Sequence, residues 1–77
     1  MRVTELVVAL DEARVDRSRT FIEGVDERPP ARAVYYLWRD GAVRWEVARR
    51  TEEGMESLFI GTEDEGCRLL QLTLGGS

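Results

Sequence analysis

The central segment from Val34 to Val47 constrains the fold more than any other part of the chain. It contains two runs of aromatic and β-branched residues, and between them lies Asp40-Gly41, a dipeptide typical of two-residue hairpin turns. A turn at Asp40-Gly41 would pair Arg39 with Ala42. The segment therefore predicts an antiparallel hairpin at the centre of a sheet.

The N-terminal third is expected to contain one amphipathic helix and one short strand. Apolar residues recur there at the spacing of a single helix face, at Val3, Leu6, Val7 and Leu10. We expect Asp16 to cap a short helical turn and Thr20–Ile22 to form a short edge strand that ends at Gly24. Pro29-Pro30 then holds the chain in an extended loop.

The C-terminal segment is expected to form a second helix. Thr62 and Glu65 have the spacing of a capping box, in which each side chain satisfies a free amide of the first turn. The buried stripe of this helix, at i, i+3 and i+7, is Cys67, Leu70 and Leu74. Gly66 weakens the helix but allows close contact with the sheet, and Gly75-Gly76 is expected to end it.

These elements give a single small α+β domain over residues 1–77. Arg49 to Gly54 is a polar loop, and Met55 to Ile60 is a third long strand whose buried face the pattern does not decide. The expected order is an N-terminal helix, an antiparallel meander of three to four strands and a C-terminal helix. Both helices are expected to cover one face of the sheet.

The hairpin register assigns its side chains to two faces, because side chains alternate along a strand. The expected core face carries Val34, Tyr36, Trp38, Val43, Trp45 and Val47. The opposite face carries Tyr35, Leu37, Arg39, Arg44, Glu46 and Ala48. We expect Tyr35, Leu37 and Arg44 to form a protein-binding surface there, since Tyr and Arg are enriched at interfaces. Alternatively, Thr20–Ile22, the Pro29-Pro30 loop or a homodimer partner covers this face.

The residue types present leave little room for catalysis. The chain has no His, which removes the commonest general base and zinc ligand, and it has a single Cys. Cys67 lies on the apolar stripe of the second helix and is expected in the core. The carboxylate pairs lack the spacing of a calcium loop. We therefore expect no catalytic residues, no metal site and no cofactor.

The segment from Thr51 to Gly66 is strongly acidic. It contains six carboxylates and no Arg, in a chain with a net charge of −4. The carboxylates expected to point outward and bind a partner are Glu52, Glu53, Glu56, Glu63 and Asp64. An acidic patch of this size speeds association with a basic protein. The alternative is a surface that serves solubility alone.

Charge and hydropathy also limit the other partners. The arginine pairs Arg17/Arg19 and Arg49/Arg50 are interleaved with acids, so nucleic acid is not an expected partner. No segment approaches the roughly 20 apolar residues of a membrane span, and Leu6–Leu10 is too short for a signal peptide. A single Cys suits a reducing compartment, and we expect a cytoplasmic protein.

From about Val34 onward, the chain resembles a group of small bacterial proteins that occur beside polymorphic-toxin genes. The resemblance is carried by three segments: Val43-Arg44-Trp45-Glu46-Val47, Ile60-Gly61-Thr62-Glu63-Asp64-Glu65 and Cys67-Arg68-Leu69-Leu70. Leu6–Val15 matches the leading helix more loosely. The chain departs from the group at Gly66, where Ala is expected, and at the Pro29-Pro30 loop. The resemblance implies a toxin-neutralising immunity protein.

The resemblance, the acidity and the missing catalytic groups point to one function. We expect a non-enzymatic immunity protein that binds a basic cognate toxin domain through its acidic surface. The alternative is a homo-oligomeric accessory or regulatory domain that associates through an open sheet face.

Overall fold

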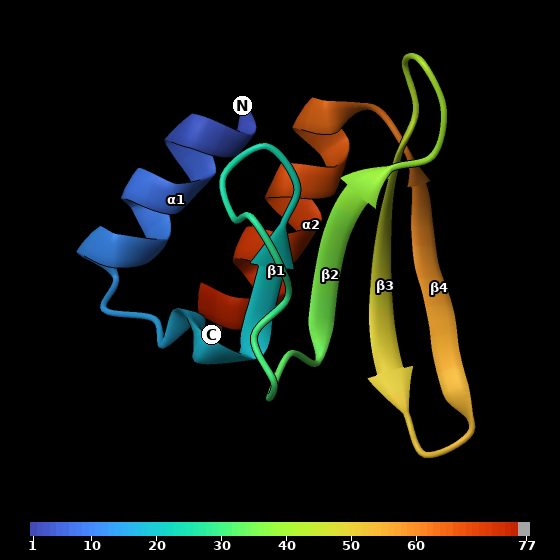
Figure 1. The fold of residues 1–77 in the computed structure, drawn as a ribbon. Helices are drawn as coiled ribbons and strands as arrows, with labels where there is room; N and C mark the ends of the chain where they lie inside the picture. Colours follow the sequence, from blue (N-terminus) through green and yellow to red (C-terminus); the bar gives the residue numbers. More distant parts are fainter. Residues whose placement is uncertain (76–77) are drawn as a thin grey trace.

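The computed structural model of the chain describes residues 1–75 (Figure 1). Its elements are α1 (Val3–Glu12), a short 3₁₀ helix (Arg17–Arg19), β1 (Thr20–Ile22), β2 (Tyr35–Arg39), β3 (Trp45–Thr51), β4 (Gly54–Gly61) and α2 (Glu63–Gly75). The α+β class, the two helices and the short strand at Thr20–Ile22 agree with the sequence. Gly75 belongs to α2, and Gly76, the second residue of the expected helix stop, lies outside the described residues.

The four strands form one mixed sheet in the order β1-β2-β3-β4. β1 runs parallel to β2, whereas β2, β3 and β4 are antiparallel. The expectation of a purely antiparallel meander is therefore wrong. Residues 23–34, including the two prolines, are long enough to return the chain to the starting end of β1, as a parallel connection requires.

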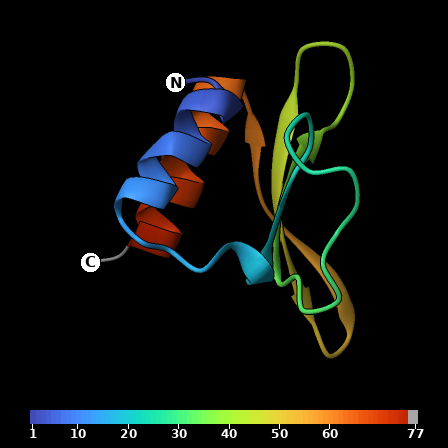
Figure 2. The same cartoon turned by 60° about the vertical axis from the view of Figure 1, so that its left-hand side comes forward.

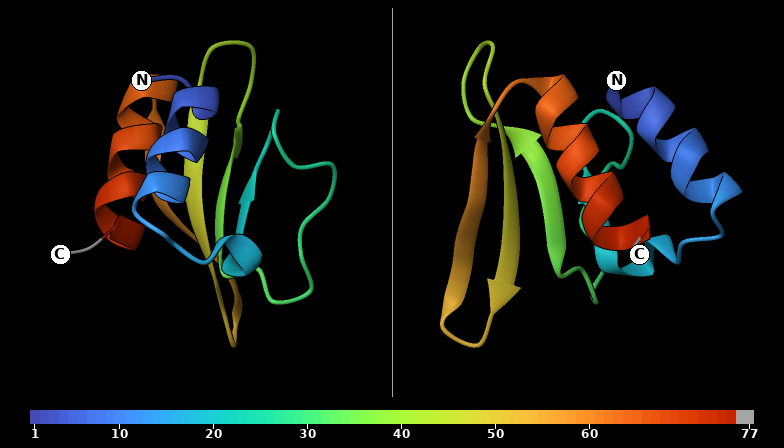
Figure 3. Two further views of the ribbon diagram at one scale, coloured as in Figure 1. Left: turned by 90° about the vertical axis from the view of Figure 1, so that its left-hand side faces the viewer. Right: turned by 180° about the vertical axis from the view of Figure 1, so that it is seen from behind.

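The sheet has a different layer on each of its two sides. Figures 2 and 3 show α1 and α2 side by side on one side of it, and the 23–34 loop on the other. We call the two surfaces of the sheet the helix-side face and the far face. The connection with the prolines thus covers the β1–β2 part of the far face.

The amphipathic pattern of the first helix is confirmed. Val3, Leu6 and Leu10 are buried, and Val8 on the opposite side is exposed. Asp16 caps the 3₁₀ helix as expected, because its carboxylate accepts the backbone N–H of Ser18 at 2.9 Å. The sequence signals for local capping and for one-sided burial are therefore reliable in this half of the chain.

The central hairpin forms, but its register differs from the expected one. Arg39 lies opposite Trp45 instead of Ala42, and residues 40–44 form a wider loop. The backbone N–H of Asp40 closes this loop on the Arg44 carbonyl at 2.8 Å. A shift by three residues is odd, so it turns every β2 side chain to the opposite face relative to β3.

The two face assignments of β2 are consequently exchanged. Leu37 is fully buried on the helix-side face, next to Val47 of β3. Tyr36 is also buried, but in a separate cluster on the far face with Ala33 and Ala48. Val43, expected in the core, lies in the loop and is 82% exposed.

The main core lies between the helices and the helix-side face. Its fully or almost fully buried members are Val3, Leu6, Leu10, Ile22, Leu37, Val47, Cys67 and Leu70. Gly66 allows α2 to approach the sheet, because a Cβ there would lie 3.0 Å from Leu37 Cδ1 and 3.7 Å from Val47 Cγ2. The expected role of Gly66 in close packing is thus confirmed.

The second half of the sheet is more regular than expected. The segment from Arg49 to Gly54, expected as a loop, instead continues β3 to Thr51 and leaves a tight turn at Glu52 and Glu53. Gly54 has φ +130°, a backbone conformation that favours glycine at the end of this turn. The capping box of α2 is confirmed: Glu65 N–H donates to Thr62 Oγ1 at 3.1 Å, and Thr62 N–H to Glu65 Oε1 at 3.2 Å.

Candidate functional site

The most open part of the described structure is β4, which forms one edge of the sheet (Figure 1). Within residues 1–75, β3 is the sole strand paired with it. Three of its apolar side chains are substantially exposed: Met55 (47%), Leu58 (39%) and Ile60 (46%). Among the large apolar residues of β4, Phe59 is the one that packs against the main core. We call the side of β4 that does not face β3 the β4 edge.

The local sequence explains this exposure. Val47 pairs with Phe59 and Ala48 with Ser57, so Leu58 is an extra residue in a β-bulge. Met55, Ser57 and Ile60 lie opposite Arg50, Ala48 and Glu46 on the far face, where the 23–34 loop does not reach β4 (Figure 3). The undecided burial pattern of Met55–Ile60 is therefore the sequence signal of a strand exposed along much of its length.

Two free carboxylates lie at the start of β4. Glu52 and Glu53 form the turn between β3 and β4, which we call the acidic turn, and both are exposed. Thr51 Oγ1 accepts the Glu53 N–H at 3.2 Å and donates to the Gly54 carbonyl at 3.1 Å, which fixes the turn. Within residues 1–75, neither carboxylate is in an ion pair.

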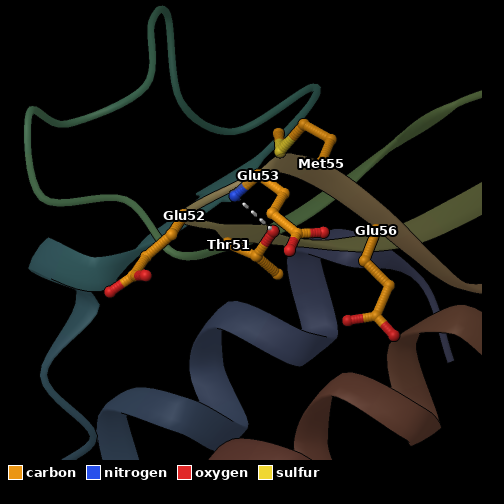
Figure 4. Close-up of a pocket in the computed structure, with 5 residues that line it drawn as sticks. All are labelled: Thr51, Glu52, Glu53, Met55 and Glu56. Atoms are coloured by element: carbon orange, nitrogen blue, oxygen red, sulfur yellow. Dashed lines mark hydrogen bonds between the residues drawn. The ribbon is translucent and has the colours of Figure 1, made fainter.

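The third predicted carboxylate of this region, Glu56, is paired within the protein. It lies opposite Arg49 in the register, and the Arg49 Nη2 to Glu56 Oε2 distance is 2.6 Å. This hydrogen bond raises the pKa of Arg49. Figure 4 shows the Glu52 and Glu56 carboxylates pointing away from one another around a shallow hollow. They do not converge, and no metal-binding cluster occurs within residues 1–75.

Glu63 and Asp64, predicted to point outward, accept hydrogen bonds from other groups of the same protein. Glu63 Oε2 accepts the backbone N–H of Val3 at 3.0 Å, at the N-terminus of α1. Asp64 Oδ1 accepts from the Met1 amino group and from Arg68 Nε, the latter at 2.9 Å. The Met1 amine and then Arg68 lower the pKa of Asp64. These two acids fasten α1 to α2 and are not free contacts for a partner.

The predicted sheet-face surface does not form. Leu37 is fully buried beneath α2, and Tyr35 packs against the main core. Arg44 is exposed in the hairpin loop, with its Nη2 3.7 Å from Asp40 Oδ2. The structure therefore does not bring Tyr35, Leu37 and Arg44 together on one surface. The odd register shift is the physical reason, since it turns Leu37 toward the helices.

The far face beside β4 carries an ordered row of side chains instead. Trp38, Glu46 and Ile60 lie in register across β2, β3 and β4. Trp38 Nε1 donates to Glu46 Oε1 at 2.6 Å, and its ring lies 5.1 Å from that of Tyr36. This row joins β4 to the interior of the sheet on the far face.

Positive charge gathers elsewhere. A shallow hollow is lined by Arg19, Arg32 and Arg50, together with Ala31 and Val34. Among residues 1–75, none of these three guanidinium groups has a carboxylate within ion-pair distance, and Arg50 donates to the Ala31 carbonyl at 3.4 Å. These three arginines therefore form a basic hollow, which reaches β4 at Arg50, opposite Met55.

The single thiol is poorly placed for reaction. Cys67 is fully buried, and burial followed by the nearby Glu63 raises its pKa to about 11. At neutral pH it is therefore a neutral core side chain, as expected from its place on the helix stripe.

Comparisons with known proteins add no further constraint on function. No family model, no curated protein and no solved structure matches the chain. Within residues 1–75, neither helix has the length and apolar character needed to cross a bilayer. The site is therefore interpreted from its geometry and charge.

Proposed function

We propose that this chain is a non-enzymatic protein inhibitor of the immunity type, which binds a basic cognate toxin domain and neutralises it. The observation that carries the proposal is the exposed strand β4, which begins at the two unpaired carboxylates of the acidic turn. An exposed apolar strand next to free charge of one sign has the composition of a protein-binding surface.

Electrostatics supports a basic partner. The net charge of −4 and the free carboxylates Glu52 and Glu53 attract a positively charged domain and raise its rate of association. Both carboxylates are exposed, so they are hydrated in the free protein and lose water only when a partner covers them. By contrast, Glu56, Glu63 and Asp64 contribute to the negative field while their oxygens are bound internally.

The arrangement of the layers agrees with this function. Both helices lie on one side of the sheet, so they leave the far face beside β4 open (Figure 2). The proposal implies no cofactor, no contact with nucleic acid or membrane, and a cytoplasmic location. The resemblance described above led to the same class.

Affinity capture from the native host tests the proposal, together with the identity of the adjacent gene. We expect the tagged protein to recover a basic toxin-like protein encoded next to it. Recovery of no such partner, and no toxin-like gene nearby, would contradict the proposal.

A matched pair of variants locates the binding surface. The change E52Q/E53Q removes two free charges beside β4, and we expect it to weaken binding at least tenfold, mainly through slower association. The control D11N/E12Q removes two exposed charges on α1, far from β4, and should leave the affinity unchanged. Equal effects of the two variants would mean that net charge, and not the acidic turn, attracts the partner.

The exposed apolar residues of β4 also favour the alternative of a homo-oligomeric accessory domain. Light scattering at tens of micromolar distinguishes the two functions. A monomer agrees with the inhibitor, whereas a stable dimer would favour the accessory domain.

A further inference from the structure

The β4 edge presents an unpaired row of backbone groups. β4 has eight residues, about 26 Å at roughly 3.3 Å per residue. Its pairing partner among residues 1–75 lies on one side, at β3. Because the N–H and C=O groups of an edge strand keep their hydrogen-bonding capacity, such a strand is a template for one more strand.

β4 lacks most of the features that protect natural edge strands. It contains no Pro and no Lys, and its one charged residue, Glu56, is paired with Arg49. The bulge at Leu58 is the single irregularity in its register. Met55 and Ile60 remain exposed on the far face, where they would contact alternate side chains of an added strand.

Acidic residues lie at both ends of this strand. Glu52 and Glu53 precede it with free carboxylates, whereas Glu63, Asp64 and Glu65 follow it after a single residue and are hydrogen-bonded within the protein. The two ends are about 26 Å apart, which is several times the Debye length of roughly 8 Å at physiological salt. Each acidic end therefore acts separately on the nearer end of a partner strand.

This distribution of charge argues against a second copy as the added strand. In an antiparallel pair of β4 strands, the acidic turn of one copy would lie beside residues 63–65 of the other. In a parallel pair, each acidic end would lie beside its own equivalent. The parallel arrangement places like charges together, and the net charge of −4 on each copy opposes association in either arrangement.

We propose that the β4 edge binds an extended segment of the basic partner as an added strand, and that this segment has an apolar centre and basic residues at the end that lies beside Glu52 and Glu53. The inference rests on the proposed function and specifies how the partner is held. Main-chain hydrogen bonds supply affinity, whereas Met55, Ile60 and the acidic turn select the sequence.

A synthetic peptide tests the mode of binding without the natural partner. The probe RRTVTVTVRR has basic ends and an alternating centre. Hydrogen exchange and chemical-shift changes measured by NMR on the intact protein should show slower exchange of β4 amides, with β1 amides unchanged. Slower exchange elsewhere, or none at all with saturating peptide, would overturn the proposal.

Two matched peptides separate strand addition from simple charge attraction. The acidic-ended EETVTVTVEE should not bind measurably. A version of the basic probe that is N-methylated at alternate residues keeps its charge but cannot complete the ladder, and it should bind at least tenfold more weakly. Equal binding of the methylated and unmethylated probes would show that charge alone holds the peptide.

A pair of variants tests the same surface from the side of the protein. The change I60K places a positive charge on β4, and we expect it to weaken binding of the basic probe at least tenfold. The control V43K makes the same chemical change at an exposed position of the hairpin loop and should leave binding unchanged. Both positions are exposed, so thermal unfolding of the two variants should stay close to that of the parent.

The natural partner distinguishes a failure of this inference from a failure of the proposed function. If E52Q/E53Q weakens capture of the partner but I60K does not, strand addition is wrong and the inhibitor function stands. If the protein alone forms dimers whose β4 amides exchange more slowly at higher concentration, the added strand is a second copy and the proposal is overturned.

Discussion

The two edge strands of the sheet are treated very differently by the rest of the chain. At β1, Thr20 and Ile22 are fully buried, and the backbone groups of Ile22 are satisfied by Asp26, whose carboxylate accepts the Ile22 N–H at 2.9 Å. The Asp26 N–H in turn donates to the Ile22 carbonyl at 2.9 Å. β4 is more than twice as long and has no comparable cover within residues 1–75.

This difference teaches that an open edge is not unavoidable in so small a sheet. In the same chain, one aspartate in the loop after β1, Asp26, satisfies the backbone N–H and C=O of Ile22. Unprotected edges favour aggregation and are usually blunted, and for this reason we propose that the open β4 edge is a surface kept for a partner.

The largest expected effect is on the free energy of unfolding and tests the packing of β2 beneath α2. Leu37→Ala removes a fully buried side chain that contacts Gly66 of α2, and we expect it to lower the free energy of unfolding by about 2–5 kcal/mol. The matched change on β4, Ile60→Ala, should cost less than about 1 kcal/mol, because Ile60 is already half exposed. Urea denaturation measures both, and similar losses would remove the distinction between the two regions.

Local signals in the sequence were sufficient to predict the helix caps and the buried face of α1. The apolar spacing of α1, the capping residues Asp16 and Thr62, and the close-packed Gly66 were all predicted from nearby residues. Each depends on contacts within one element or on a single glycine. The helix spacing and the caps are readable because their physical causes lie within a few positions of one another, whereas Gly66 is readable because a glycine inside a helix is itself unusual.

The hairpin register and the acidic contacts depended on distant parts of the chain. Asp40-Gly41 favours a two-residue turn, but the packing of Leu37 and Val47 beneath α2 accompanies a wider loop. Glu63 and Asp64 bind the start of α1, about sixty positions away, so their outward orientation could not be tested from local sequence. The candidate site was predicted in part: the acidic turn is free, whereas Leu37 is buried.

A second, smaller effect concerns the junction between the open strand and the packed layer. Thr62→Ala removes the hydroxyl that accepts the Glu65 N–H at the start of α2, and should cost about 1 kcal/mol. Hydrogen exchange should show faster opening in the first turn of α2 and little change in β1. A loss shared equally by both edges would mean that the sheet unfolds as one unit.

A third comparison uses the same substitution at the two edges. Thr20 Oγ1 is buried and donates to the Arg17 carbonyl at 3.1 Å, so Thr20→Val should cost about 0.5–1 kcal/mol. Thr51 Oγ1 donates to the Gly54 carbonyl at 3.1 Å in a wetter environment, and Thr51→Val should cost less than about 0.5 kcal/mol. Thermal unfolding measures the two losses, and the reverse order would contradict the difference in burial.

The smallest expected effect is a difference in pH dependence between the two ends of the sheet. Asp16 precedes β1, and the Ser18 N–H lowers its pKa below 3.8. Asp64 follows β4, and the Met1 amine and Arg68 lower its pKa in the same direction. A lowered pKa in the folded state adds stability that is present above the unfolded value and is lost as the pH falls through the folded value. The stability of the parent should therefore decrease below about pH 4, and Asp16→Asn or Asp64→Asn should each make this decrease shallower.

High salt distinguishes the contribution of Asp64 to stability from that of Asp16. The Asp64 contacts join opposite charges at a half-exposed carboxylate, so 1 M salt should remove most of the difference between Asp64→Asn and the parent. The Asp16 contact is a hydrogen bond from a backbone amide, and its contribution should change less with salt. Denaturation from pH 2 to pH 7 at low and high salt measures both. If salt acted equally on the two variants, the contact of Asp64 with the Met1 amine would not be what holds the start of α1 to α2.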